Sequence, residues 1–133
     1  MAEVTRVSTN SLASLLPDPS QKITGLVAGE VLTPGDACYI KASDGRVYKS
    51  NGTALTEVGR VDGWAMLDTS IGDPVTLIHD VNFEYGSGLT PGARYFVSAA
   101  NSGKLVDAAN TGSPAPVAFA VDSKRVHVML SRY

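Results

Sequence analysis

The sequence predicts an all-β protein, a small sandwich or barrel of short antiparallel strands. Turn-forming residues recur about every eight to twelve residues from Ile23 onward, a spacing typical of sandwiches and barrels. The runs between the turns are rich in Val, Ile, Tyr and Phe, which favour strands. No segment keeps the apolar period of about 3.6 residues over three turns that an amphipathic helix needs. Alternating strands and helices are therefore not expected.

The turns that separate the runs combine glycine with proline, aspartate, asparagine or serine. Pro34-Gly35 and Pro91-Gly92 suit the central positions of a type II turn, because proline presets φ and glycine accepts a positive φ. Asp44-Gly45 has the tolerance of positive φ that a two-residue hairpin loop requires. The strands expected between the turns lie at residues 37–42, 46–49, 57–66, 75–78, 81–85, 93–99, 104–106, 117–121 and 125–130.

The first 20 residues differ from the rest, so we expect an extended N-terminal arm (1–20) and a single β domain (21–133). Pro17 and Pro19 end the one helical turn that residues 11–16 offer, since each proline fixes φ and removes a donor. The arm either packs on its own domain or reaches a neighbouring molecule, and the sequence leaves both alternatives open. The candidate partner-binding residues are the apolar side chains of the arm and the C-terminal tyrosine: Val4, Val7, Leu12, Leu15, Leu16 and Tyr133.

An internal repeat runs through the β domain. Leu32-Thr33-Pro34-Gly35 recurs as Leu89-Thr90-Pro91-Gly92, 57 positions later. Five elements follow each copy in the same order: a strand with tyrosine, a glycine turn, a short strand, a loop with asparagine and a last β-like run. This last run lies at 58–61 in the first copy and at 117–121 in the second. This order predicts an internal duplication with halves at 25–67 and 86–130. The alternative is that Leu-Thr-Pro-Gly is simply a favourable sequence for entering a hairpin and occurs twice without duplication.

Composition excludes several classes of function. Charged residues make up 18% of the chain, below the typical ~25% for a soluble domain, as expected of a subunit that buries surface against partners. The net charge is −2 and no run of Lys or Arg occurs, so we expect no nucleic-acid partner.

Cys38 is the only cysteine, which excludes an intramolecular disulfide and a Cys-based zinc site and suggests a buried thiol. No stretch approaches the ~18 apolar residues of a membrane span, and no signal-peptide pattern opens the chain, so we expect a protein made and kept inside a cell, or assembled there into something larger.

No constellation of catalytic residues is visible, and the sequence predicts a protein that is not an enzyme and uses no cofactor or metal. His79-Asp80 could be half of a site, but a strand-end pair is the stronger interpretation. His127 alternates with the aliphatic residues of its strand and so points to solvent or an interface. Trp64 is either a core residue or a partner anchor, with the core favoured. The carboxylates beside turns are expected to accept hydrogen bonds from their own backbone: Glu30, Asp36, Asp62, Asp68, Asp73 and Asp80.

Three segments resemble the capsid decoration (head cement) proteins of tailed bacteriophages: Gly25–Asp36, Tyr39–Gly52, and Gly88–Ser98 together with Pro116–Val121. The resemblance covers roughly residues 25–130 and lies in turns and strands. It implies a structural virion protein, made in the host cytoplasm, that binds the major capsid protein on the outer capsid surface and stabilises the expanded head. It also implies a homo-oligomer, with a trimer favoured. Such proteins clamp neighbouring capsomers, and many copies give avidity from modest contacts.

Three alternatives remain at this stage. A tail-fibre or receptor-binding module would share the pattern of the second half, but is expected within a longer chain. A carbohydrate- or oligonucleotide-binding barrel would favour exposed aromatic residues interleaved with Arg or Lys, whereas aromatic residues make up only 7% here. An enzyme of the dUTPase or esterase type would require a motif that the sequence lacks.

Overall fold

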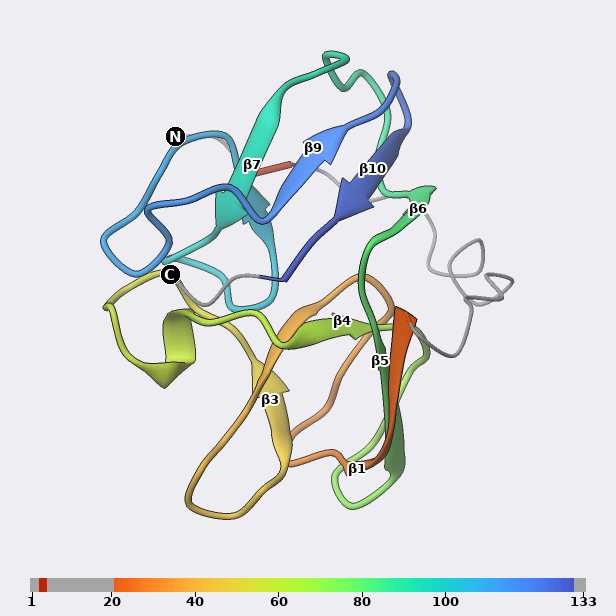
Figure 1. Cartoon of the computed structure of the whole chain (residues 1–133), viewed down its shortest axis with the longest axis vertical. Helices are drawn as coiled ribbons and strands as arrows, with labels where there is room; N and C mark the ends of the chain where they lie inside the picture. Colours follow the sequence, from red (N-terminus) through yellow and green to blue (C-terminus); the bar gives the residue numbers. More distant parts are fainter. Residues whose placement is uncertain (1–2, 5–20, 131–133) are drawn as a thin grey trace.

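The structure, a computed structural model, describes residues 3–4 and 21–130 and has the predicted all-β fold. Ten short strands form two antiparallel five-stranded sheets, consistent with a small β-sandwich domain (Figure 1). The first sheet contains β1 (Lys22–Val27), β2 (Ala37–Ile40), β3 (Val47–Lys49), β4 (Gly63–Ala65) and β5 (Pro74–Ile78). The second contains β6 (Val81–Glu84), β7 (Arg94–Val97), β8 (Leu105–Val106), β9 (Ala118–Ala120) and β10 (Arg125–Val128).

The two sheets have the same strand order. The first reads β1-β5-β4-β2-β3 and the second reads β6-β10-β9-β7-β8, so each strand of one sheet has a counterpart in the other. The matching units are longer than the halves read from the sequence, because β5 belongs to the first unit. In addition, β9 corresponds to β4 and not to residues 58–61, which were expected to match it.

The two Leu-Thr-Pro-Gly segments form the same turn. Gly35 and Gly92 have φ of 90° and 82°, as the second central position of a type II turn requires. The backbone N–H of Gly35 donates to Ala65 O at 2.8 Å, and that of Gly92 donates to Ala120 O at 2.8 Å. Since Ala65 ends β4 and Ala120 ends β9, each turn is fixed to the same strand of its own sheet.

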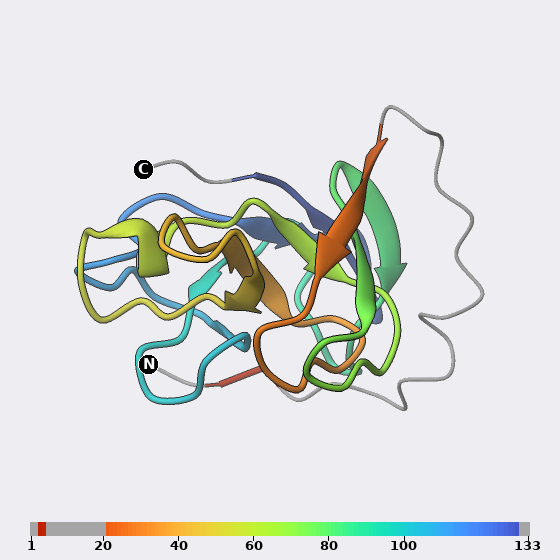
Figure 2. The ribbon, with the colours of Figure 1, turned by 90° about the horizontal axis from the view of Figure 1, so that it is seen from below.

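Three local expectations were wrong. Residues 22–27 form β1 at the outer edge of the first sheet (Figure 2), although Gly25, at φ 82°, interrupts the alternation of side chains and shifts the register against β5. Only Gly63–Ala65 of the run 57–66 is a strand, because Glu57–Gly59 form a 3₁₀ turn. The loop at Asp44-Gly45 is longer than two residues: pairing ends at Ile40↔Val47, and Lys41 N–H donates to Arg46 O.

A larger and a smaller core lie within the domain. The larger one contains the inner side chains of the second sheet together with four residues of the first unit: Ala37, Val61, Trp64 and Ile78. Trp64 is fully buried and its indole N–H donates to Met129 O at 3.0 Å, which confirms its interpretation as a core residue. The smaller core lies within the first unit and contains Ala28, Leu32, Cys38, Val47, Ala65, Val75 and Leu77. A shared core therefore joins the two sheets.

Loops of the two units also meet backbone to backbone. Gly52 N–H donates to Ser98 O at 3.0 Å, and Gly112 N–H donates to Gly52 O at 2.9 Å. A Cβ atom on Gly112 would lie 2.3 Å from Ala54 O, and one on Gly52 would lie 2.4 Å from Val97 O. These glycines are therefore required by the close approach of two backbones.

Candidate functional site

The most distinctive surface of the described chain is a row of four side chains on the second sheet, here called the outer row: Arg94, Phe119, His127 and Asn82. Backbone pairing sets them side by side across four strands, as Arg94↔Phe119, Phe119↔His127 and His127↔Asn82. Their neighbours along each strand are buried in the larger core. Because successive side chains of a strand point to opposite faces, the outer row faces away from that core.

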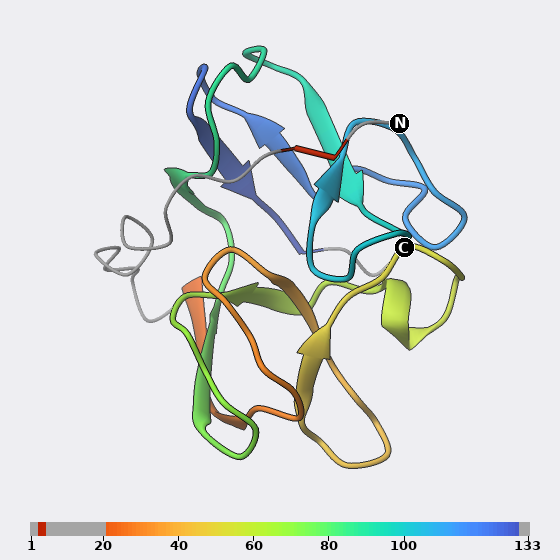
Figure 3. The same ribbon diagram turned by 180° about the vertical axis from the view of Figure 1, so that it is seen from behind.

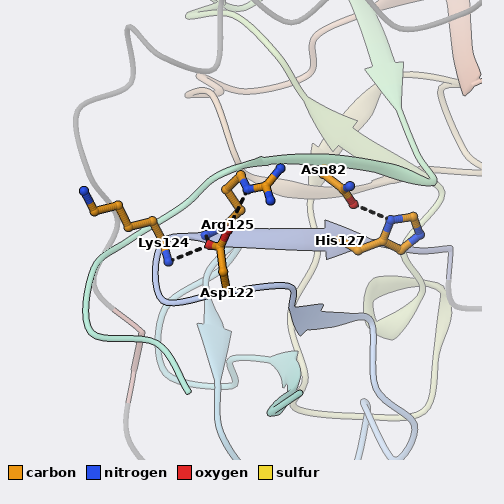
Figure 4. Close-up of polar contacts among 5 residues, drawn as sticks. All are labelled: Asn82, Asp122, Lys124, Arg125 and His127. Atoms are coloured by element: carbon orange, nitrogen blue, oxygen red, sulfur yellow. Dashed lines mark hydrogen bonds and ion pairs between the residues drawn. The ribbon is translucent and has the colours of Figure 1, made fainter. Parts of the chain in front are cut away.

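The four side chains contact one another in sequence. The guanidinium of Arg94 lies 4.9 Å from the centroid of the Phe119 ring, a cation–π distance. The rings of Phe119 and His127 are 5.2 Å apart, with an interplanar angle of 33°. His127 Nδ1 lies 2.7 Å from Asn82 Oδ1 (Figure 4), so each end of the row has a polar group and its middle has two rings. Arg94 and Asn82 are exposed, while the two rings are partly buried.

A charged turn adjoins the outer row where β10 begins. The Asp122 carboxylate accepts hydrogen bonds from the backbone N–H of Lys124 at 2.9 Å and of Arg125 at 2.7 Å. It also accepts one from Arg125 Nε at 2.8 Å (Figure 4). The Lys124 N–H, followed by the hydrogen bonds and charge of Arg125, lowers the pKa of Asp122 to about 2. A shallow hollow of about 350 Å³ lies here, lined by Glu84, Asp122, Ser123, Lys124 and Arg125.

The equivalent row of the first sheet has a different environment. Backbone pairing aligns Ala37, Trp64, Ile78 and Lys22 in the same order as the outer row. The first three are buried in the larger core, and only Lys22 is exposed. The second unit therefore covers this row of the first sheet, whereas no described part of the chain covers the outer row of the second.

The residues proposed from the sequence do not form one site. Val4 packs against the larger core of its own domain, and its N–H donates to Leu105 O at 3.0 Å. Its role in partner binding stays a prediction. The other candidate residues, Val7, Leu12, Leu15, Leu16 and Tyr133, lie outside the described part of the chain.

His79 and Asp80 connect β5 to β6 and thus join the two sheets. His79 Nδ1 lies 2.7 Å from Asp80 Oδ2, and Asp80 N–H donates to Val128 O at 2.7 Å. Asp80 has φ of 55°, a conformation that aspartate adopts more readily than most residues. The pair is therefore a strand-end connection, as the stronger of the two sequence interpretations had it.

Asp36 and Asp73 accept backbone hydrogen bonds within their own turns, as expected, whereas Glu30 and Asp62 accept theirs from distant strands, from Lys49 N and Ile40 N, both at 2.9 Å. Asp36 Oδ2 accepts from Thr33 N at 2.8 Å, and Asp73 Oδ2 accepts from Ser70 N at 3.0 Å. Within residues 3–4 and 21–130, no group of three or more His, Cys, Asp or Glu side chains is arranged to hold a metal ion. Burial raises the pKa of the Cys38 thiol well above its ordinary value, which matches the buried thiol expected from its strand.

Sequence reasoning missed the outer row, although one of its members was flagged. His127 was expected to face solvent or an interface because it alternates with aliphatic neighbours. Arg94 and Phe119 lie in the same phase of their own strands, but only the pairing of β7, β9 and β10 brings the three together. It also missed the exposed apolar side chains Val31, Leu67 and Ile71, on loops joined by the Leu32↔Thr69 bridge.

No helix in the described part of the chain is long and apolar enough to cross a membrane. Comparison of the sequence with protein-family models and with curated proteins finds no match in either set.

Proposed function

We propose that this chain is a structural virion protein that binds the major capsid protein on the outer surface of a tailed-phage head and stabilises the expanded shell. The observation that carries the binding part of this proposal is the outer row, a sheet face whose counterpart in the first unit is buried. The choice of partner rests on the resemblance of residues 25–130 to capsid decoration proteins.

The chemistry of the outer row supports a protein partner. Aromatic and arginine side chains are enriched where protein interfaces bury their most important contacts. Phe119 and His127 supply flat apolar area, and Arg94 supplies a guanidinium whose position is already fixed over a ring. Because these side chains are held by one another before binding, less conformational entropy is lost when a partner covers them.

The fold supports a clamping role. Two sheets with a shared core and backbone hydrogen bonds between their loops form a stiff body, which can resist displacement of the capsomers it contacts. The proposed oligomer, with a trimer favoured, would present several copies of the outer row at once. Each copy then needs only a modest affinity, because binding of the first copy raises the effective concentration of the others.

The test is binding of the purified protein to DNA-filled, expanded heads of the cognate phage prepared without it, with unexpanded procapsids for comparison. We expect saturable binding to expanded heads. Arg94→Glu should weaken it at least about tenfold, the equivalent of about 1.4 kcal/mol, because it removes the cation–π contact and reverses the charge at one end of the outer row. The matched control is Arg46→Glu, the same reversal at an exposed position in the 41–46 hairpin loop of the first unit.

Absence of binding to either shell would contradict the proposal. A glycan array would then test the carbohydrate-binding alternative, in which Phe119 and His127 would stack on a sugar ring. Equal loss of binding in Arg94→Glu and Arg46→Glu would keep the capsid partner but remove the outer row as its contact.

A further inference from the structure

The outer edge of β8 differs from the corresponding edge of the first sheet. In the first sheet that edge is β3, and it is closed by Ala28, the residue that directly follows β1: Ala28 bridges Val47, and Gly29 N–H donates to Val47 O at 2.9 Å. In the second sheet the edge strand is β8, and residues from the far N-terminal end of the chain close it. Glu3 bridges Val106 in antiparallel orientation, and Val4 N–H donates to Leu105 O (Figure 3).

The surface around Glu3 and Val4 has the features of a strand-binding edge. A hollow of about 300 Å³ lies on one side, lined by Glu3, Ser98, Asn101, Val106 and other residues of the loop before β8. A second hollow of about 350 Å³ lies beside Val4 and is lined by Leu89, Ala93, Tyr95 and their neighbours. The Glu3 carboxylate accepts a hydrogen bond from the Asn101 side chain, and Val4 packs against the larger core. Backbone pairing at an edge with flanking recesses is the geometry by which sheets bind an extended segment.

The segment that fills this edge is joined to the rest of the fold by a long connection. Residues 5–20 separate Val4 from Gln21, and the contour length of that stretch is about 55–60 Å. A domain of about 110 residues has a radius of gyration of about 13 Å. The connection is therefore long enough for the N-terminal residues of one molecule to reach the β8 edge of another.

We propose that Glu3–Val4 of one copy occupies the β8 edge of a second copy, so that strand exchange joins copies of this chain. Every copy carries both the segment and the edge, and the contacts are identical within and between chains, which makes exchange a low-cost route to an oligomer. An empty β8 edge would expose unpaired backbone groups, so each edge is expected to be filled in the assembly. This inference does not depend on capsid binding.

The test uses single cysteine variants on separate chains. Glu3→Cys and Val106→Cys place thiols at paired positions of an antiparallel bridge, within the Cα separation that a disulfide spans. The two proteins, one carrying an affinity tag, are refolded together and oxidised. We expect a disulfide-linked heterodimer of about twice the 13.9 kDa chain mass, captured by the tag and absent when either variant is oxidised alone. Wild-type protein, whose only thiol is the buried Cys38, is the control for background oxidation.

The chain carrying both substitutions shows whether the edge forms and whether the disulfide closes. A disulfide within single chains of this double variant, combined with no heterodimer from the mixed single variants, would overturn the proposal in favour of a segment that stays on its own chain. Because the assay contains no capsid, its outcome is separate from that of the head-binding experiment.

Discussion

The two sheets share one strand order, yet equivalent positions in them have different roles. Trp64 and Ile78 pair in the first sheet, and Phe119 and His127 take the same places in the second. The first pair is buried, whereas the second is partly exposed. Strand topology therefore determines which side chains are neighbours, but the packing of one unit on the other determines which of them lose contact with water.

The side chains of the covered row and of the outer row also differ in their chemistry. The covered row is almost entirely apolar, and its one polar group within the core, the indole N–H of Trp64, donates to Met129 O. In the outer row the Arg94 guanidinium lies over the Phe119 ring and the His127 imidazole is hydrogen-bonded to the Asn82 amide, so its polar groups have partners at the surface and need no burial. A buried polar group without a partner costs a few kcal/mol, so the two rows could not exchange their residues without loss of stability.

Truncation of the two aromatic residues should give the largest contrast. Trp64→Ala is expected to reduce the free energy of unfolding by about 3–5 kcal/mol, because it leaves a cavity in the larger core. Phe119→Ala, at the equivalent but partly exposed position, should cost about 1–2 kcal/mol. Urea denaturation followed by far-UV circular dichroism measures both. Equal losses would mean that the outer row is buried in solution and is not a free surface.

Two glycines provide the next comparison, Gly112 in a loop between the units and Gly25 in β1. Gly112→Ala should cost about 2–3 kcal/mol, because its Cβ would lie 2.3 Å from Ala54 O and within 2.8 Å of two more backbone atoms of Ala54, which cannot move aside as a flexible side chain could. Gly25→Ala has open space around it but a φ of 82°, and should cost about 1 kcal/mol. Thermal unfolding of both variants gives the ranking. The reverse order would indicate that the loops separate easily and that the shared core alone holds the units together.

The Leu-Thr-Pro-Gly turns differ in the residue that follows, Asp36 in the first unit and Ala93 in the second. Asp36 is buried, and its carboxylate accepts from Thr33 N at 2.8 Å and Thr33 Oγ1 at 3.1 Å. Asp36→Ala should reduce the free energy of unfolding by about 1–2 kcal/mol, since hydrogen bonds to a charged group are lost. The control is Asp44→Ala, which removes an exposed carboxylate that accepts from Arg46 N at 2.9 Å and Tyr48 Oη at 2.6 Å, and should cost less than Asp36→Ala because water can replace the lost partners at the surface. If Asp36→Ala left the free energy of unfolding unchanged, the turn would be held by its backbone hydrogen bonds alone, as in the second unit.

The smallest expected effect is the pH dependence that Asp122 adds beside the outer row. Its folded-state pKa of about 2 lies below the ordinary 3.8, so its contribution to stability is present above about pH 4 and is lost as the pH falls towards 2. Asp122→Asn should lower the melting temperature slightly at pH 5, and its difference from wild type should shrink as the pH falls towards 2. An NMR titration of the Asp122 carboxyl group reports the pKa directly. A midpoint near 4 would show that the turn at Lys124 and Arg125 is open in solution.

Local sequence by itself determined the fold class and most strand positions. Alternation, β-branched and aromatic residues, and turns such as Pro34-Gly35 act within a few residues, so their signals survive without the rest of the molecule. The burial of Trp64 and Cys38 also followed from apolar neighbours along the chain. The strand prediction failed at β1, where Gly25 interrupts the alternation of side chains. It also failed in part of the run 57–66, where residues 57–59 form a 3₁₀ turn and not a strand.

Only the tertiary structure decided which faces are covered. Residues 94, 119, 127 and 82 lie on four strands that span 45 positions of the sequence, and the pairing of those strands makes them one surface. The placement of Glu3 and Val4 on β8 likewise depends on contacts about a hundred residues apart. The physical reason is that burial depends on packing between elements: the same alternating strand pattern is compatible with a covered face in one unit and an open face in the other, until the two units pack together.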